Sequence, residues 1–162
     1  MTLVSTNPDT QARTLTVVAE FAAPPSRVWQ LWSDPRQLER WWGPPTWPAT
    51  FLEHDLVPGG SARYVMTGPA GEQAGGWWRF LSVDEPRSLE LEDGFADEDG
   101  NPAAEMPTTR MRMTLEESGG STRMTLVSSF ATTEQMEQLT SMGMVEGLTA
   151  ALGQMDELLA AA

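Results

Sequence analysis

The sequence contains no cysteine and a single histidine, His54. Disulfide bonds and thiolate metal sites are therefore excluded, and one histidine cannot build a histidine-rich metal centre. Any zinc-dependent or Ser-His-Asp mechanism would have to run through His54 alone. We therefore expect no metal site, no cofactor and no set of catalytic residues.

Lysine is absent as well, so all 10 basic residues are arginine, against 23 acidic residues and a formal net charge of -13. This balance argues against nucleic-acid binding and against anionic membrane surfaces, because both need clustered cations. No apolar run approaches the ~18 residues of a membrane-spanning helix, and the first residues lack the pattern of a signal peptide. We therefore expect a cytoplasmic protein without nucleic-acid or membrane partners.

Tryptophan and methionine are abundant, with 7 and 10 residues respectively. Tryptophan is large and costly to expose, whereas methionine is flexible and fills irregular apolar space. Together they indicate either a bulky core or a cavity that tolerates more than one shape.

The hydrophobic pattern divides the chain into a tail and one domain. Residues 1–12 are polar and predict a flexible N-terminal tail, and residues 13–162 predict one domain of ordinary size. The domain begins with β-branched residues at 14–21, which predict a strand.

Helical spacing of apolar residues appears twice. It predicts two short helices over 25–34 and 36–42, with Asp34 capping the second. A stripe of methionine and leucine then predicts one long helix over 133–160.

Between the short helices and the long one, the hydrophobic period changes to two. Alternation and Gly/Pro turns predict six strands that form an antiparallel meander, with a long acidic hairpin loop over 94–107. The predicted strands are 49–56, 61–66, 75–84, 88–93, 110–117 and 122–130. The long helix is the only candidate to cover the apolar face of this sheet.

The strand over 110–117 alternates most strictly. Its apolar positions are Met111, Met113 and Leu115, and its polar positions are Arg110, Arg112 and Thr114. We expect the apolar set to face the helix and the polar set to face water, because a one-residue slip would reverse every side chain.

Four segments, in this order, resemble those of a known family: VWQLWSDPRQLERWWGP, DLVPGGSARYVMTGPAG, GGWWRFLSVDEPRSLELED and SMGMVEGLTAALGQMDELL. The family comprises activators of the heat-shock-protein ATPase, within the START-like (SRPBCC), birch-pollen-allergen-like superfamily, and the resemblance covers residues 14–160. It implies the α+β helix-grip fold, in which a curved antiparallel sheet wraps around a C-terminal helix. It also implies a cavity that takes lipids, polyketides or other apolar molecules in many relatives, but no single reaction.

Aromatic residues are the first candidates for this cavity. Trp41 and Trp42 end the second short helix. They form either a cavity wall or core anchors that fix the short helices against the sheet. Trp47, in the proline-rich loop that follows, is a candidate for the mouth. Trp78 and Phe80 share one face of a strand, and we expect that face to point inward.

The long helix and the neighbouring strands supply the other candidates. Gly143 and Gly147 lie four residues apart on one helix face, and they either leave room for a ligand or allow close packing against the sheet. Arg63 would anchor a carboxylate or phenolate ligand if it pointed inward, and would otherwise be a surface residue. The full candidate set is Trp41, Trp42, Trp47, Arg63, Trp78, Phe80, Met111, Met113, Gly143, Met144, Gly147 and Leu148.

Three functions are compatible with this sequence. The first is non-catalytic binding of a small apolar or amphipathic molecule, lipid- or polyketide-like. The second is a polyketide cyclase- or hydratase-like enzyme, which needs an acid or base in the cavity. The third is an interaction domain that regulates a chaperone ATPase, which needs a large complementary surface. A homodimer is compatible with all three. The residues able to supply an acid or base are Glu53, His54, Asp55, Arg63 and Tyr64, depending on strand parity.

Overall fold

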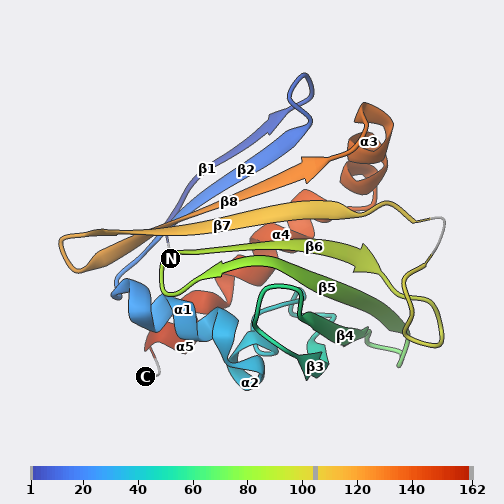
Figure 1. The fold of residues 1–162 in the computed structure, drawn as a ribbon, viewed down its shortest axis with the longest axis horizontal. Helices are drawn as coiled ribbons and strands as arrows, with labels where there is room; N and C mark the ends of the chain where they lie inside the picture. Colours follow the sequence, from blue (N-terminus) through green and yellow to red (C-terminus); the bar gives the residue numbers. More distant parts are fainter. Residues whose placement is uncertain (1, 104–105, 161–162) are drawn as a thin grey trace.

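The computed structural model describes residues 2–103 and 106–160, which form a curved antiparallel sheet with helices on its concave side (Figure 1). The strands are β1 (Thr2–Asp9), β2 (Thr14–Phe21), β3 (Ala49–His54), β4 (Ser61–Thr67), β5 (Gln73–Asp84), β6 (Ser88–Phe95), β7 (Thr109–Ser118) and β8 (Ser121–Phe130). The helices are α1 (Pro25–Ser33), α2 (Pro35–Leu38), α3 (Thr133–Ser141), α4 (Met144–Gly153) and α5 (Met155–Ala160).

The sheet has eight strands in the order β1-β2-β8-β7-β6-β5-β4-β3. Strands β3 to β8 form the meander that the alternating pattern predicts, and every neighbouring pair is antiparallel. Strand β2 joins the meander by pairing with β8. The expected α+β class and antiparallel sheet are confirmed.

The segment predicted to be a flexible tail forms the edge strand β1 instead. It pairs with β2 from Thr2, opposite Glu20, to Asp9, opposite Thr14. Without β1, one edge of β2 would expose a row of unpaired N–H and C=O groups. Pro8 fits here because an edge strand tolerates a residue without an N–H. The polar composition of the segment therefore reflects its place at the sheet edge.

The two short helices form the predicted pair, although the second is shorter. Both begin at a proline, which suits the first helical turn. The Asp34 side chain accepts a hydrogen bond from the Arg36 backbone N–H at 3.0 Å and caps α2 as expected. Helix α2 ends at Leu38, and the chain reaches Trp42 through turns rather than through further helix.

The single long helix predicted over 133–160 is divided into α3, α4 and α5. Gly143 separates α3 from α4 and has a φ of +88°, a left-handed conformation that ends the helical ladder. Gln154 separates α4 from α5. Its side-chain amide donates to the carbonyl oxygens of Trp41 at 3.2 Å and Gly43 at 2.7 Å. The apolar stripe predicted the helical residues but not the joints, because periodicity continues through a single left-handed glycine.

Strand faces follow the predicted alternation. In β7, Met111, Met113 and Leu115 are buried, Arg110 and Arg112 are exposed, and Thr114 is half-buried. In β5, Trp78 and Phe80 are fully buried, so this face points inward as expected.

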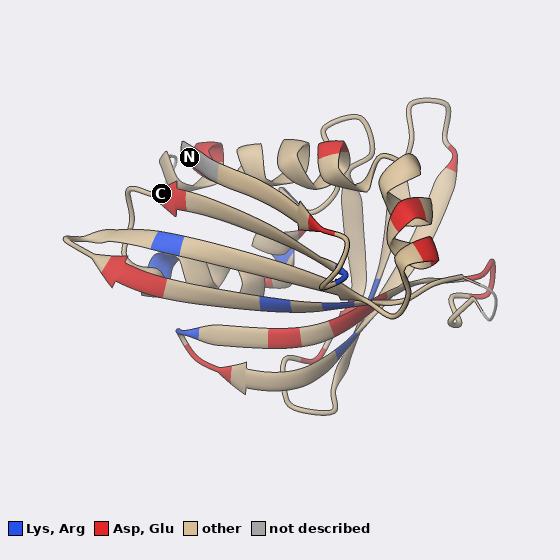
Figure 2. Cartoon of the chain, turned by 90° about the horizontal axis from the view of Figure 1, so that it is seen from above, with Lys and Arg blue, Asp and Glu red and all other residues tan. Residues whose placement is uncertain are grey.

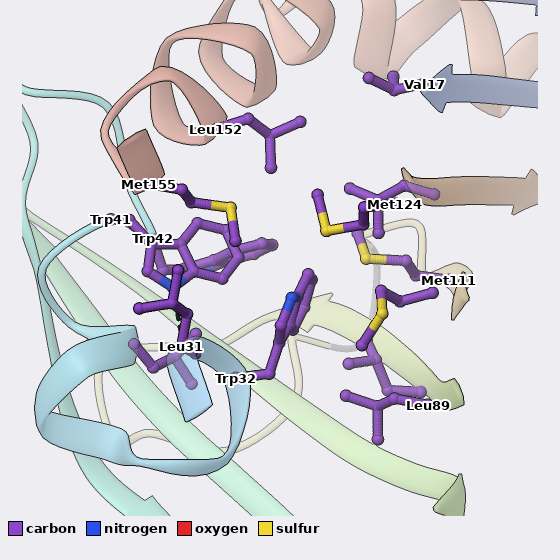
Figure 3. Close-up of a cluster of buried hydrophobic side chains, with 14 of the residues drawn as sticks. Val17, Leu31, Trp32, Trp41, Trp42, Leu89, Met111, Met124, Leu152 and Met155 are labelled. Carbon is purple, nitrogen blue, oxygen red and sulfur yellow. Dashed lines mark hydrogen bonds between the residues drawn. The ribbon is translucent and has the colours of Figure 1, made fainter. Parts of the chain in front are cut away.

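Interlocking tryptophans fill one end of the core, between α1, the turn after α2 and α5 (Figure 3). The ring centroids of Trp32 and Trp41 lie 4.8 Å apart, and those of Trp42 and Trp78 lie 4.9 Å apart. Both pairs meet edge to face, which aromatic quadrupoles favour. Met155 of α5 packs against the same cluster (Figure 3).

Charged residues are distributed over the strands, the hairpin ends and the helices (Figure 2). Residues 133–160, which form the three C-terminal helices, include acidic residues and no basic residue. In residues 2–103 and 106–160, no helix has the length and apolar character needed to span a membrane.

The tryptophan cluster yields a paired stability prediction. Trp41 donates its indole N–H to the Leu31 carbonyl at 2.8 Å, while the indole N–H of Trp32 has no partner among the described residues. The residue that would normally bond to the Leu31 carbonyl in a helix is residue 35, a proline without an N–H. We expect Trp41→Phe to lower the free energy of unfolding by about 1 kcal/mol more than Trp32→Phe, because only Trp41→Phe leaves the buried Leu31 carbonyl without a hydrogen-bond donor.

Urea denaturation followed by circular dichroism measures this difference. Both tryptophans are fully buried, so the two variants lose similar volume and each serves as the control for the other. Equal losses would show that the Trp41 hydrogen bond contributes nothing beyond packing.

Candidate functional site

A cavity of about 260 Å³ lies between the sheet and the joint of α3 and α4. Strand residues that line it are Tyr64, Met66, Asp93, Phe95, Thr109 and Met111. Helix and joint residues that line it are Leu139, Met142, Gly143, Met144, Gly147 and Leu148. The turn after α2 adds Trp42 as a wall. This space, which we name the Asp93 cavity, is therefore enclosed mainly by apolar side chains.

One polar pair lies in the floor of the cavity. The Tyr64 hydroxyl donates a hydrogen bond to Asp93 Oδ1 at 2.9 Å. Tyr64 is on β4 and Asp93 on β6, so the bond crosses the intervening strand β5. Gly76 of β5 lies opposite Tyr64, and a Cβ at this glycine would overlap the tyrosine ring and hydroxyl. The missing side chain at Gly76 therefore opens the path between Tyr64 and Asp93.

The environment of Asp93 favours its protonated form. Burial raises the pKa of Asp93 from 3.8 to about 7, because the ionised carboxylate loses hydration. This rise is opposed by donors that favour the ionised carboxylate, namely the Tyr64 hydroxyl, the nearby Trp78 indole and the Gly94 N–H. The indole does not reach full hydrogen-bond geometry. Protein surrounds Asp93, but it keeps some exposed surface because it lines the cavity. Near neutral pH, Asp93 therefore exists in both protonation states.

Tyr64 remains a neutral donor across the same range. Burial raises the pKa of Tyr64 well above 10, and the negative charge of Asp93 raises it further. Tyr64 and Asp93 are the titratable residues among those that line the cavity. The site thus offers a ligand a mainly apolar surface with one hydrogen-bonded pair of titratable side chains.

The cavity opens to solvent beside the α3–α4 joint. Met142 lines the cavity and is nevertheless 53% exposed. Gly143 and Gly147 also line it, and a Cβ added at either glycine would meet open space. This observation favours the interpretation in which the glycines leave room, rather than the one in which they permit close packing against the sheet.

Six of the predicted site residues line the cavity: Trp42, Met111, Gly143, Met144, Gly147 and Leu148. Four others, Trp41, Trp78, Phe80 and Met113, are buried in the adjoining core and do not line it. For Trp41 this corresponds to the core-anchor interpretation. Trp47 is half-buried and packs over Gly68 at the end of β4, so it lies outside the cavity lining.

The interpretation of Arg63 as an inward anchor is wrong. Arg63 is exposed, and its Nε lies 3.6 Å from Glu53 Oε2 on the outer face of the sheet. Alternation along β4 explains this, because Tyr64 points inward and its neighbour must point outward.

His54 lies outside the cavity lining, with its Nε2 3.2 Å from the Trp32 carbonyl oxygen. Burial lowers the pKa of His54, so the neutral ring is favoured there. Within residues 2–103 and 106–160, no three His, Asp or Glu side chains gather as a metal ion would require.

The sequence analysis did not predict Asp93 as a cavity residue, although its position in the alternating pattern of β6 indicates an inward side chain. Leu89 and Leu91 of β6 are buried, and Asp93 continues the same alternating positions inward. We predicted Asp93 as the last residue of the strand over 88–93 but did not assign its side chain to the cavity. Met66, Phe95, Thr109 and Leu139 were also not predicted as lining residues.

Adding a single methyl group at Gly76 tests whether this glycine keeps the path between Tyr64 and Asp93 open. We expect Gly76→Ala to displace the Tyr64 ring and to weaken its hydrogen bond to Asp93. The bond stabilises the ionised carboxylate, so its loss should raise the pKa of Asp93 by up to about one unit. NMR titration of the Asp93 carboxyl carbon measures this shift. The control is Gly75→Ala, whose Cβ would meet Ala96 Cβ at 3.1 Å and the backbone oxygen of Tyr64 at 3.8 Å, an ordinary contact that leaves the tyrosine ring in place.

Asp93 should also make stability depend on pH. Its pKa is about 7 in the folded protein and 3.8 as a reference value, so the folded state binds the proton more tightly. The resulting stabilisation is complete below pH 3.8 and is lost as pH rises through about 7. We expect the free energy of unfolding to fall between pH 4 and pH 8 by roughly 1–3 kcal/mol more in the wild type than in Asp93→Asn. Urea titrations at both pH values test this, and a pH-independent difference would contradict it.

Comparisons with known proteins agree with this architecture. The profile of the family described as Activator of Hsp90 ATPase homolog 1-like protein matches residues 22–160. No curated protein matches the chain.

Several solved structures are similar to it. A protein from Arthrobacter aurescens has 50% identity and a TM-score of 0.95, covering 99% of this chain and 94% of that one. A protein from Mycobacterium smegmatis has 48% identity and a TM-score of 0.90, covering 97% and 96%. The AHSA1 protein from Silicibacter pomeroyi has 25% identity and a TM-score of 0.72, covering 91% and 97%. With its curved sheet and C-terminal helices in the helix-grip arrangement, the chain belongs to the Activator of Hsp90 ATPase homolog 1-like protein family.

Proposed function

We propose that the protein binds a small apolar or amphipathic molecule in the Asp93 cavity. The observation that carries the proposal is the cavity itself, which is apolar, open to solvent beside Met142 and equipped with one polar pair. Ligand sites commonly combine an apolar lining with a few polar groups that fix orientation.

The lining also suits ligands of varied shape. Met66, Met111, Met142 and Met144 all line the cavity, and methionine side chains adapt to different neighbours. The volume of about 260 Å³ lies just below the range of roughly 300–1,000 Å³ that is common for ligand pockets. We therefore propose a ligand of modest size, such as a small aromatic, a short lipid or a polyketide fragment.

A second candidate is enzymatic, of the cyclase or hydratase kind. It is favoured by one observation, the hydrogen-bonded Tyr64–Asp93 pair, in which the pKa of the carboxyl is near 7. A group with this pKa is suited to general acid–base catalysis at neutral pH. Mass spectrometry of a bound molecule after long incubation separates the candidates, because a binder returns the molecule unchanged and an enzyme does not.

Filling the cavity tests the proposal directly. Gly147 lines the cavity and has open space at its Cβ position, so Gly147→Leu should place a side chain in the ligand volume. We expect 1-naphthol to quench tryptophan fluorescence and to raise the melting temperature of the wild type. At free ligand one hundred times the Kd, the stabilisation should be about 2.7 kcal/mol. Gly147→Leu should abolish both effects while the protein stays folded.

The matched control is Gly153→Leu. Gly153 is on the same helix, is exposed, has open space at its Cβ position and does not line the cavity. This variant should respond to 1-naphthol like the wild type. If Gly147→Leu also responds normally, the ligand binds elsewhere on the protein.

A further inference from the structure

The Asp93 cavity combines an apolar lining with a negatively charged group that no lining cation balances. Among the described residues that line the cavity, Asp93 alone carries a charge near neutral pH, and none is arginine or histidine. Arg63, the cation nearest in sequence to Tyr64, points to the outer face and pairs with Glu53. A ligand that enters the cavity therefore meets a carboxyl group and no cation to balance it.

The groups that face Asp93 leave acceptor capacity on the carboxylate. Tyr64 donates to Oδ1, Trp78 of β5 and Thr109 of β7 are the cross-strand neighbours, and α4 presents Gly147 and Leu148 to the same cavity. Of these groups, Tyr64 alone is titratable, and it stays neutral at physiological pH. An ionised carboxylate accepts about four hydrogen bonds, so one further donor can approach from the cavity.

The surroundings of the mouth add to this asymmetry. Helices α3 and α4, which roof the cavity, carry Glu134, Glu137 and Glu146 and no basic residue. The whole chain has a formal net charge of -13. A field of this sign raises the local concentration of cations and lowers that of anions.

We infer that the ligand of the Asp93 cavity is an amphipathic amine, whose protonated head binds Asp93 while its apolar body fills the methionine-lined space. The inference rests on the proposed function. An ammonium group compensates the buried carboxylate, whereas an alcohol leaves its charge unbalanced and a carboxylate repels it. Fatty acids and other anionic lipids are therefore poor ligands.

Three compounds with one apolar body and different heads test the inference: 2-(1-naphthyl)ethylamine, 2-(1-naphthyl)ethanol and 1-naphthaleneacetic acid. Isothermal titration calorimetry at pH 8 gives the Kd of each. We expect the amine to bind at least about tenfold more tightly than the alcohol, and the acid at least about tenfold more weakly than the alcohol, because one close charge pair contributes at least this factor when desolvated.

Substitution of the carboxyl should remove the preference. We expect Asp93→Asn to bind the amine and the alcohol with Kd values within about threefold of each other, since an amide provides no charge to pair. The matched control is Glu92→Gln, which also replaces a carboxylate by an amide, at the adjacent position of β6, whose side chain belongs to the opposite face. It should keep the wild-type preference.

A measurement on the unmodified protein covers the case in which Asp93→Asn fails to fold. Binding of an ammonium group favours ionised Asp93, so at pH 7 the amine should displace about half a proton per site, because the pKa of Asp93 is about 7. Calorimetry in phosphate and in Tris detects this release, and the alcohol should show none.

The outcomes separate the inference from the function on which it rests. If the alcohol binds as tightly as the amine and Gly147→Leu abolishes both, the cavity binds ligands but the amine inference is wrong. Tighter binding of the acid would overturn it in the same way. If none of the three compounds binds the wild type, both the inference and the proposed cavity function are contradicted.

Discussion

The spacing between the helices and the sheet is set by a cluster of rigid rings, and the rest of the molecule is arranged around that spacing. Trp32, Trp41, Trp42 and Trp78 interlock at ring-centroid distances between 4.8 and 6.3 Å. Indole rings cannot be compressed, so they hold the turn after α2 and the helix α5 away from the strands. Beyond the cluster, methionine, leucine and glycine residues of α3, α4 and their joint do not fill the same gap, and the Asp93 cavity lies there.

The Tyr64–Asp93 pair is a buried polar pair that is built at a cost in stability. Burial of an ionisable carboxyl disfavours folding at any pH where the group is charged. An asparagine would avoid that cost at the same position. Natural proteins accept such costs chiefly at functional sites. The partial compensation by Tyr64 depends on a third residue, Gly76, which contributes only the absence of a side chain.

Much of the fold could be predicted from the sequence because its two periodicities are clear. Alternation placed Met111 and Met113 on the inner face, and the cap at Asp34 separated the short helices as observed. The predictions fail where the hydrophobic pattern does not mark a structural change. The left-handed Gly143 breaks a helix without interrupting its apolar stripe. The strand β1 is polar because it lies at an edge, so composition alone could not separate it from a tail.

The candidate site was harder to predict than the fold, since it depends on contacts across strands. Half of the expected residues line the cavity, and these were chiefly the residues of α4 and its joint. Asp93 was missed because its acidic neighbours suggest solvent, although Leu89 and Leu91 share its parity. Its pairing with Tyr64 needs the order of β4, β5 and β6 and the gap at Gly76, which only the assembled sheet supplies.

The position of β2 has a consequence for how the chain reaches this structure. One edge of β2 is completed by β1 within a local hairpin, but its other edge pairs with β8, which begins at Ser121. During synthesis, that second edge has no partner until more than a hundred further residues have left the ribosome. The Thr122 hydroxyl, which donates to the Ala23 carbonyl at 2.6 Å, closes the same long loop. Contacts so distant in sequence slow folding, so sheet completion is a late, post-translational event in which β1 already shields half of the exposed strand.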